Sequence, residues 1–284
     1  MSNKLSRIKE RTRNILEAVS LLESSKNVKE VVKCIKSPYY KPRPSLWSLR
    51  TDYIDKRIGV SKRWNYAYIR IPKCANSLVT VNLDYYLPEK GEYPRRNPRV
   101  VSKARRNFHR LRSLSKKEIN FLIEEGHVFV VVRNPYHRIL SAYLDKINRP
   151  SYVEQYGSGI REAGENDLSF TSFCMWLNCN NKYKNPHWFP QVEYINTIGI
   201  HNIDYIWDIN KVENMIKRIV YILSENNPNC VHDPHFGSHD AEDHKTHAAS
   251  KTLEYYNEKS IEIIQNLYRD DFELLGYDTS DIGR

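Results

Sequence analysis

Hydrophobic and polar positions follow a helical period over the first part of the chain and change character after a proline-rich break. Apolar residues recur at helical spacing over residues 4–36, which predicts an amphipathic helix. Three prolines within 37–45 interrupt this pattern and predict an extended connector. We therefore expect an N-terminal helical appendage over 1–45, followed by one domain over 46–284.

Within the domain, the first stretch typical of a strand covers residues 66–71 and stops at Pro72. A helix is predicted to follow it over 76–86, with Asn76 or Ser77 as its N-terminal cap. The domain thus begins with a strand that leads directly into a helix.

A second strand is predicted at 127–132, a continuous apolar run typical of a strand buried on both faces. The helix predicted before it, over 115–125, begins with a capping box of Ser115 and Glu118. An Asn-Pro pair at 134–135 favours the start of another helix directly after the strand. This second strand therefore also ends in a strand-to-helix junction.

The alternation of elements continues along the rest of the chain. Further helices are predicted over 169–178, 210–224 and 251–268, and further strands over 193–198 and 203–207. Because helices and strands alternate, we expect an α/β fold with a central parallel sheet that is flanked by helices on both faces.

Charge is distributed unevenly along the chain, whose net charge is +10. Residues 1–114 hold 27 basic and 9 acidic residues, whereas 115–284 hold 17 and 25. This asymmetry favours a phosphorylated ligand, an acidic polymer or a membrane surface as partner of the first part. The run from Arg95 to Arg112 has eight basic residues and no acidic one, and either lines a cleft for an anionic glycan or is simply solvated. Its few aromatic residues disfavour nucleic acid as the partner.

The five cysteines are odd in number and include no CxxC pair, which indicates neither a zinc ribbon nor a disulfide framework. Reduced thiols are typical of cytosolic proteins. The first residues are charged throughout, and no window approaches the roughly 20 apolar residues of a membrane span. We therefore expect a cytoplasmic protein without a transmembrane segment.

The junction from Ile71 to Ser77 has the features of an anion site. A strand-to-helix turn aims backbone N–H groups and the positive helix end at one point, and Lys73 adds a mobile charge. The spacing of a Walker motif is absent, which counts against a P-loop NTPase. By itself the pattern is as typical of an ordinary turn as it is of an anion site. Cys74 is either a reactive thiol in this electropositive turn or a small filler.

The second junction runs from Arg133 to Tyr143. Arg133 follows a buried strand, at the carboxyl edge where α/β sheets bind ligands. Arginine offers a planar fork for a phosphate, and Ser141, two turns into the helix, offers a hydroxyl. An isolated arginine here would more often pair with a core carboxylate, so the junction must be judged together with the first one.

Together and in this order, the two junctions resemble the carbohydrate sulfotransferase family. There, a Pro-Lys strand-loop-helix binds the 5′-phosphosulfate of 3′-phosphoadenylyl sulfate (PAPS), and Arg-x-Pro-[Tyr/Phe]-x-Arg-[Leu/Ile]-x-Ser-Ala-[Tyr/Phe] binds its 3′-phosphate. The second pattern is matched almost position by position from Arg133 to Tyr143. Segments 185–191 (NPHWFPQ) and 267–277 (LYRDDFELLGY) also resemble family segments, so the resemblance covers about 60–280.

The resemblance implies the sulfotransferase fold, with a P-loop-like central sheet, and PAPS-dependent sulfuryl transfer that releases adenosine 3′,5′-bisphosphate (PAP). Lys73 would stabilise the leaving oxygen, and Arg133 with Ser141 would anchor the 3′-phosphate. The backbone of the first junction would hold the phosphosulfate, through residues Lys73, Cys74, Ala75, Asn76 and Ser77. No metal is required.

Transfer to a hydroxyl calls for a general base, because a hydroxyl has a pKa far above 7. His187 in the family-like segment is the first candidate, with His109 and His247 in reserve; a structural histidine is the alternative. The acceptor is expected to be a carbohydrate or another hydroxyl compound, an anionic one included. Asn134 and the stretch 205–211 depart from the family pattern and leave the acceptor open.

The His- and Asp-rich loop 232–247 has irregular spacing for a metal site, and the resemblance implies a mobile loop over the nucleotide. Lys245, Thr246 and Ser250 are its candidate nucleotide contacts. Two other functions remain open: a nucleotide-dependent kinase, and a non-catalytic basic protein that binds polyanions or nucleic acid.

Overall fold

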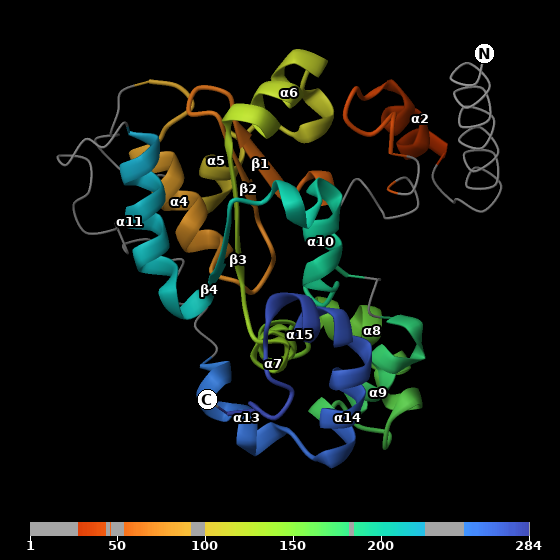
Figure 1. Cartoon of the computed structure of the whole chain (residues 1–284). Helices are drawn as coiled ribbons and strands as arrows, with labels where there is room; N and C mark the ends of the chain where they lie inside the picture. Colours follow the sequence, from red (N-terminus) through yellow and green to blue (C-terminus); the bar gives the residue numbers. More distant parts are fainter. Residues whose placement is uncertain are drawn as a thin grey trace, which may run out of the picture. The chain divides into compact units, whose positions relative to one another are not determined.

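The computed structural model describes residues 28–43, 46, 54–91, 100–181, 185–224 and 247–283 (Figure 1). The chain divides into two compact units. Unit 1 comprises residues 1–68 and 108–128, and unit 2 comprises residues 69–107 and 129–284. Of the helix predicted over 4–36, only α2 (Val28–Lys36) lies within the described residues, and the domain boundary near residue 45 stays a prediction.

Unit 1 contains a β-hairpin and a capped helix. Strands β1 (Ile58–Ser61) and β2 (Tyr66–Ile69) are joined by a turn over 62–65, and so short a connection makes the pair antiparallel. The capping box predicted for α6 (Lys116–Glu125) is confirmed, because Ser115 Oγ accepts from the N–H of Glu118 and Ser115 N–H donates to its carboxylate.

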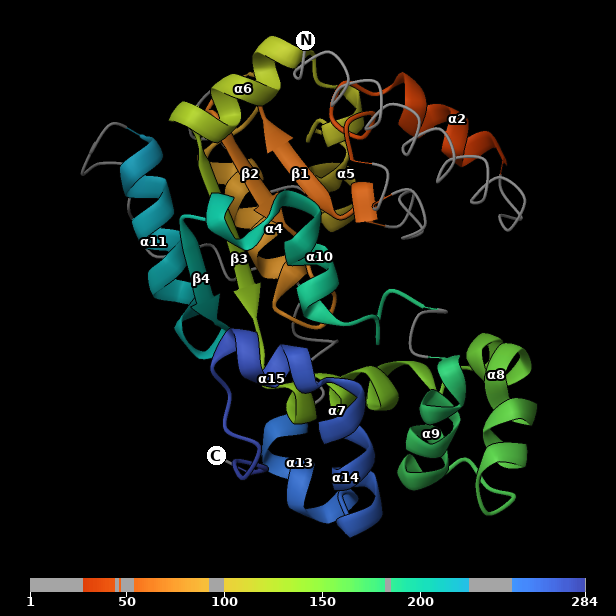
Figure 2. The same cartoon turned by 45° about the vertical axis from the view of Figure 1, so that its right-hand side comes forward.

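Strands β3 (His127–Val132) and β4 (Tyr205–Asp208) are parallel, with Phe129 opposite Tyr205. In unit 2, α4 (Asn76–Tyr86) and α11 (Val212–Leu223) cover one face of these two strands and α10 (Gln191–Ile198) the other (Figures 1 and 2). The predicted α/β fold, with a sheet between helices, is confirmed.

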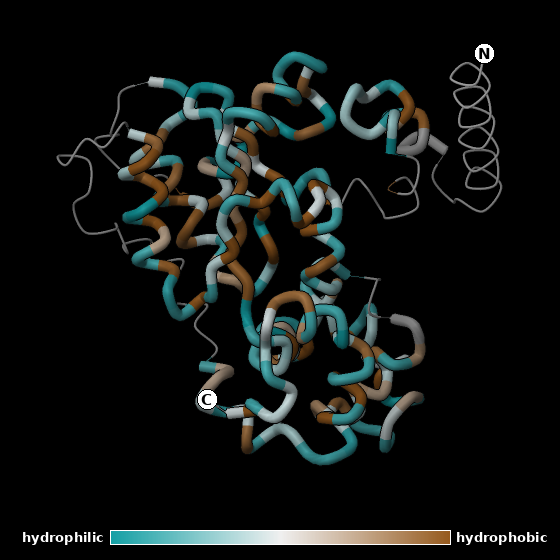
Figure 3. The backbone as a smooth tube through the Cα atoms, viewed as in Figure 1, coloured by the Kyte–Doolittle hydropathy of each residue, from teal (hydrophilic) through white to brown (hydrophobic). Residues whose placement is uncertain are grey.

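Strand β3 is the buried strand that its apolar run predicts. Its residues from Val128 to Val132 are all buried, and Figure 3 shows this stretch as hydrophobic. A strand that is covered on both sides needs apolar side chains on both faces, which explains the continuous run. Its carboxyl end leads straight into α7 (Pro135–Lys146), as expected.

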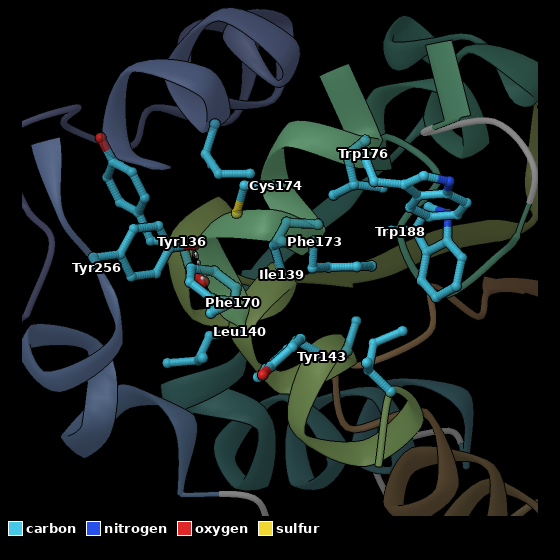
Figure 4. Packing of buried hydrophobic residues seen from close by; sticks show 14 of the residues in the cluster. Tyr136, Ile139, Leu140, Tyr143, Phe170, Phe173, Cys174, Trp176, Trp188 and Tyr256 are labelled. Carbon is cyan, nitrogen blue, oxygen red and sulfur yellow. Dashed lines mark hydrogen bonds between the residues drawn. The ribbon is translucent and has the colours of Figure 1, made fainter. Parts of the chain in front are cut away.

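Helix α7 lies in a second, aromatic core of unit 2. The helices around it are α8 (Pro150–Ala163), α9 (Phe170–Trp176), α13 (Ala248–Tyr255), α14 (Glu258–Leu267) and α15 (Arg269–Leu275). Figure 4 shows Tyr136 and Tyr143 of α7 packed among Phe170, Phe173 and Tyr256. The ring centroids of Phe170 and Tyr256 are 4.7 Å apart, in an edge-on arrangement. This packing holds α7 in place, and with it the residues of its first turn.

Three details of the predicted elements are wrong. Residues 193–198 form part of α10 and not a strand, since Asp271 accepts the N–H groups of Gln191 and Val192, both at 2.9 Å, and so caps the start of this helix. The helix predicted over 251–268 is two helices, because Asn257 caps α14 and ends the continuity. The cap predicted for α4 at Asn76 or Ser77 is wrong, because the helix begins at Asn76 and the residue before it, Ala75, provides no side-chain cap.

Other expectations agree with the structure to within a few residues. The helices predicted over 169–178 and 210–224 correspond to α9, with the π-helix Leu177–Asn181 after it, and to α11. Helix α8 and the short α5 (Val101–Arg105) were not expected. Among the helices that the structure describes, none combines the length and apolar character needed to cross a membrane.

Candidate active site

The first junction is a tight turn over 72–75 between β2 and α4. Lys73 has φ 71° and Ala75 has φ 51°, so both lie in the left-handed region that L-residues rarely adopt. The small side chain of Ala75 limits the strain of this conformation. The first N–H groups of α4 have no intrahelical acceptor and no side-chain cap, which leaves the positive end of the helix available to an anion.

The second junction lies in direct contact with the first. Arg133 follows β3, and its guanidinium Nη1 donates to the backbone oxygen of Lys73 at 3.3 Å, although 60 positions separate the two residues. Asn134 caps α7 by accepting from Tyr136 N at 2.9 Å. The structure therefore brings together the two motifs that the sequence singled out.

Gln191 joins the two junctions from the start of α10. Its side chain is fully buried; the oxygen accepts from Arg133 N at 3.0 Å and from the thiol of Cys74 at 3.3 Å. Its amide nitrogen donates to Arg133 O at 2.8 Å. Both backbone groups of Arg133 are thus fixed by one side chain. In the sequence, Gln191 stands at the end of a family-like segment, and no local motif predicts this role.

Arg138 performs a similar role on the other side of the first turn. It is 1% exposed, donates through Nε to Pro72 O at 3.1 Å and through Nη2 to Phe189 O at 2.8 Å. The third family-like segment, 185–191, is thereby held beside the first junction. Because both contacts are to backbone carbonyls of different segments, Arg138 ties the first junction to this segment.

Lys73 is paired with a carboxylate that the sequence reading missed. Its Nζ lies 3.0 Å from Oδ2 of Asp145, and both side chains are 11% exposed. Burial, first of all, lowers the pKa of Lys73, and Asp145 partly opposes this shift. The available signal was the spacing of Ser141 and Asp145 at i and i+4 on α7, which places the two residues on one helix face.

Arg133 and Lys73 share an electrostatic property that favours an anionic ligand. Burial lowers the pKa of Arg133 as well as that of Lys73, because both cations lose water. An anion that binds between them would restore the stability of both charged forms. Ser141 is buried on α7, 2% exposed, two turns beyond the arginine, and its phosphate contact stays a prediction.

Cys74 behaves as a filler and not as an activated thiol. Its side chain is fully buried, and burial raises the pKa of the thiol to about 11. A thiol of that pKa is almost entirely protonated near neutral pH. The electropositive neighbours Arg138 and Arg133 lower the pKa but do not outweigh the burial.

His187 lies near side chains that contact the Lys73–Asp145 pair. Its ring centroid is 6.5 Å from that of Tyr152, and Lys146 Nζ is 5.7 Å from the Tyr152 ring centroid. Lys146 in turn binds Asp145 at 2.8 Å. His187 is thus linked through two side chains to the carboxylate that binds Lys73, and its role as base stays a prediction.

The two reserve histidines occupy different places. His109 belongs to unit 1, where its backbone pairs with Val60. His247 precedes α13 with φ 48°, and Ser250 Oγ donates to its carbonyl oxygen at 2.9 Å. Lys245 and Thr246 lie outside the described residues, as does most of the loop 232–247.

Among the described residues of the basic run, Arg105 contacts the first junction. Helix α5 packs on α4 through Val101 and Ala104 against Val81, and Arg105 Nη2 donates to Ser77 Oγ at 3.4 Å. Residues 92–99 lie outside the described part of the chain. Within the described ranges, no three His, Cys, Asp or Glu side chains gather closely enough to hold a metal ion.

Comparison with known proteins agrees with this geometry. Residues 56–278 match the model of the sulfotransferase family. The chain is similar to carbohydrate sulfotransferase 14 of Mus musculus, with 26% identity over 170 residues, and to that of Homo sapiens, with 25% identity over 172 residues. Each match covers 56% of this chain and 44% of the relative, so the aligned part is less than half of each relative. No solved structure matches. Since the family match spans most of its length, this chain belongs to the sulfotransferase family.

Proposed function

We propose that this protein transfers a sulfuryl group from PAPS to a hydroxyl group of a carbohydrate. The observation that carries the proposal is the contact between Arg133 and the backbone of Lys73, since it joins two cationic junctions into one site. PAPS carries anionic groups at both ends of its nucleoside, the 5′-phosphosulfate and the 3′-phosphate. Two adjoining cationic junctions suit such a donor better than they suit a ligand with one anionic group.

The residues of each junction suit one half of this donor. The phosphosulfate would lie at the start of α4, where the N–H groups at Asn76 and Ser77 and the Lys73 ammonium offer donors. The 3′-phosphate would lie against Arg133, with the hydroxyl of Ser141 as a second donor. Binding of anions there would offset the loss of water that lowers the pKa of Lys73 and of Arg133.

The reaction would be an in-line displacement at sulfur. The acceptor oxygen forms a bond to sulfur while the bond from sulfur to the bridging oxygen breaks, and the electron pair of that bond stays on PAP. Lys73 would stabilise the charge that grows on the bridging oxygen. The proton of the acceptor hydroxyl would pass to a base, for which His187 is the candidate. Positioning and charge stabilisation would supply most of the rate enhancement, as in phosphoryl transfer.

The acceptor and the location belong to the proposal. A carbohydrate acceptor is supported by the names of the similar relatives, both carbohydrate sulfotransferases. An acidic glycan would also suit the basic run from Arg95 to Arg112. A cytoplasmic location is supported by the four free cysteines among the described residues. Cell fractionation of the full chain tests the location.

Thermal stabilisation by nucleotides tests the donor. PAP should raise the melting temperature and ADP should not, because a ligand that binds only the folded state stabilises it by about 2.7 kcal/mol at 100 times its Kd. Arg133→Ala should abolish the preference for the 3′-phosphorylated ligand. The exposed Arg161→Ala is the matched control and should keep this preference. Equal stabilisation by ADP and PAP would instead favour a nucleotide-dependent kinase, and no stabilisation by either would favour a non-catalytic polyanion-binding protein.

A further inference from the structure

Asp145 is shared by three cations next to the first junction. Its carboxylate binds Lys73 at 3.0 Å and Lys146 at 2.8 Å, and it also forms a short ion pair with Arg149. Arg149 Nε donates in addition to the backbone oxygen of Asp145 at 2.7 Å. Three positive charges around one negative charge leave this cluster with an excess of positive charge. An arrangement of this kind can lose one cation and remain compensated.

We propose that Asp145 is a positioning residue that holds the Lys73 side chain ready in the donor-free enzyme and releases it to the donor. Lys146 and Arg149 keep the carboxylate compensated during this exchange. The inference rests on the proposed function, because it requires a sulfuryl donor that replaces Asp145 as the partner of Lys73.

The need for such a partner follows from the chemistry of lysine. Its ammonium sits on a flexible stem, and ordering that stem is a cost that a ligand must otherwise meet on binding. A contact to Asp145 fixes the stem beforehand. The side chain of Lys73 is 11% exposed, and burial disfavours its charged form. A carboxylate at 3.0 Å therefore both orders the side chain and favours its protonation.

The possibility of release follows from the other two cations. A buried carboxylate that lost its only partner would be left uncompensated, which is strongly unfavourable. Asp145 retains Lys146 and Arg149 when Lys73 turns to an anion, and both lie on or directly after α7. Helix α7 also carries Ser141 and follows Arg133, so one element would set both the 3′-phosphate contact and the resting position of Lys73.

The charges around the pair favour positioning over proton transfer. Lys73 faces Asp145, Lys146 and Arg133, and Asp145 faces its three cations, with Tyr152 of α8 nearby. Burial alone would raise the pKa of Asp145, but Lys146 and Lys73 outweigh it and hold the pKa well below its ordinary value. A carboxylate so stabilised in its charged form is a weak base. Asp145 is therefore suited to hold a cation and not to accept the acceptor's proton.

The test measures the reactivity of Lys73 directly and needs no acceptor. The full chain is acetylated with a limiting amount of an amine-reactive acetylating reagent over a range of pH. Mass spectrometry quantifies the acetylation of Lys73, with the exposed Lys251 as internal reference. Asp145→Asn should be acetylated at Lys73 about three- to tenfold faster than the unaltered protein, the change expected from losing one close ion pair. The pH midpoint of this reaction should also fall, because the uncharged amine forms at lower pH once the carboxylate is gone.

A second variant should change the acetylation rate of Lys73 in the opposite direction. Arg149→Gln removes a compensating cation, so Asp145 should hold Lys73 more tightly, and acetylation of Lys73 should become slower. PAP should then bind more weakly to Arg149→Gln, because it must take Lys73 from a stronger partner, and calorimetry measures this change. The exposed Glu154→Gln on α8 removes one negative charge without contacting the cluster, and should resemble the unaltered protein in both measurements.

The outcomes separate this inference from the proposed function. Equal acetylation of Lys73 in the unaltered protein, Asp145→Asn and Arg149→Gln overturns the role of Asp145. If Asp145→Asn does not fold, the Arg149→Gln result alone decides, since unchanged or faster acetylation contradicts the proposal. Failure of PAP to bind the unaltered protein or to protect its Lys73 contradicts the proposed donor, whereas the acetylation series without PAP still decides whether Asp145 positions Lys73.

Discussion

Cys74 and Lys73 are neighbours in the same turn, and burial affects them differently. The Lys73 side chain keeps 11% of its surface exposed, whereas the Cys74 side chain is fully buried and its thiol donates to Gln191. A positive surrounding activates a thiol only when the thiolate can also be solvated or paired. For Cys74 the loss of water is the larger effect, which raises its pKa to about 11.

Alkylation checks this difference. With iodoacetamide at about pH 8, Cys179 should be modified in the folded protein and Cys74 should not, because a raised pKa leaves little thiolate below it. In denaturant both should react, and this serves as the control. Modification of Cys74 at the rate of Cys179 in the folded protein would show that its thiol is accessible and activated after all.

At the scale of residues, the sequence identified the groups with characteristic local motifs and missed their distant partners. Lys73 and Arg133 stand in recognisable strand-to-helix junctions, so their place in the fold could be predicted. Asp145 and Gln191 act through contacts with residues 72 and 58 positions away. Spacing along one helix or loop does not reveal such contacts, because the three-dimensional fold decides which side chains meet.

Elements were predictable where local signals and burial agree. The run at β3 is apolar throughout and buried on both faces, and its strand was predicted with the observed bounds. Helix α10 was mistaken for a strand because its short apolar stretch fits both periods. What decides its helical state is the capping by Asp271, a residue about 80 positions later that is itself buried. Tertiary contacts override local propensity in such short segments.

Helix α5 places one arginine of the basic run differently from its neighbour. Arg105 donates to Ser77 at the start of α4, whereas Arg106 is exposed. Arg105→Gln should weaken binding of PAP about fivefold to thirtyfold, as loss of one charged contact of about 1–2 kcal/mol gives, and Arg106→Gln should leave it unchanged. Calorimetry with PAP measures this difference.

Adenosine 3′-monophosphate supplies the control, since it lacks the 5′-phosphate. Arg105→Gln should bind it as the unaltered protein does, while Arg133→Gln should bind both nucleotides more weakly. If Arg105→Gln and Arg106→Gln weaken PAP binding equally, the effect is one of overall charge and Arg105 has no specific place at the first junction.

At the scale of the whole chain, the C-terminal segment of unit 2 contacts the element that carries the second junction. The last residues return to the start of α7, where Asn134 Nδ2 donates to Asp281 O at 3.0 Å and Tyr136 Oη donates to Thr279 O at 2.8 Å. The His137 ring lies 3.2 Å from Ile282 O. The family match runs from 56 to 278, so the C-terminal partners in these contacts lie beyond its end.

Removal of residues 278–284 should therefore destabilise the site as well as the fold. Loss of these hydrogen bonds is expected to lower the free energy of unfolding by about 1–4 kcal/mol, and the melting temperature by several degrees. PAP binding should weaken because α7 loses support at its first turn. Thr279→Ala is the matched control, since only the backbone carbonyl of this residue accepts from Tyr136. Unchanged melting and binding after the truncation would mean that the final segment contributes nothing to the site.

Gln191 has a consequence for how the two halves of a donor would cooperate. A single side chain contacts the Cys74 thiol of the first turn and both backbone groups of Arg133. A ligand that fixes the conformation of one turn therefore also fixes that of the other. Two fragments, a 3′-phosphorylated nucleoside and inorganic sulfate, should then each increase the affinity for the other. Thermodynamic linkage requires this coupling to be equal in both directions. Each half of the nucleotide would thus prepare the place of the other.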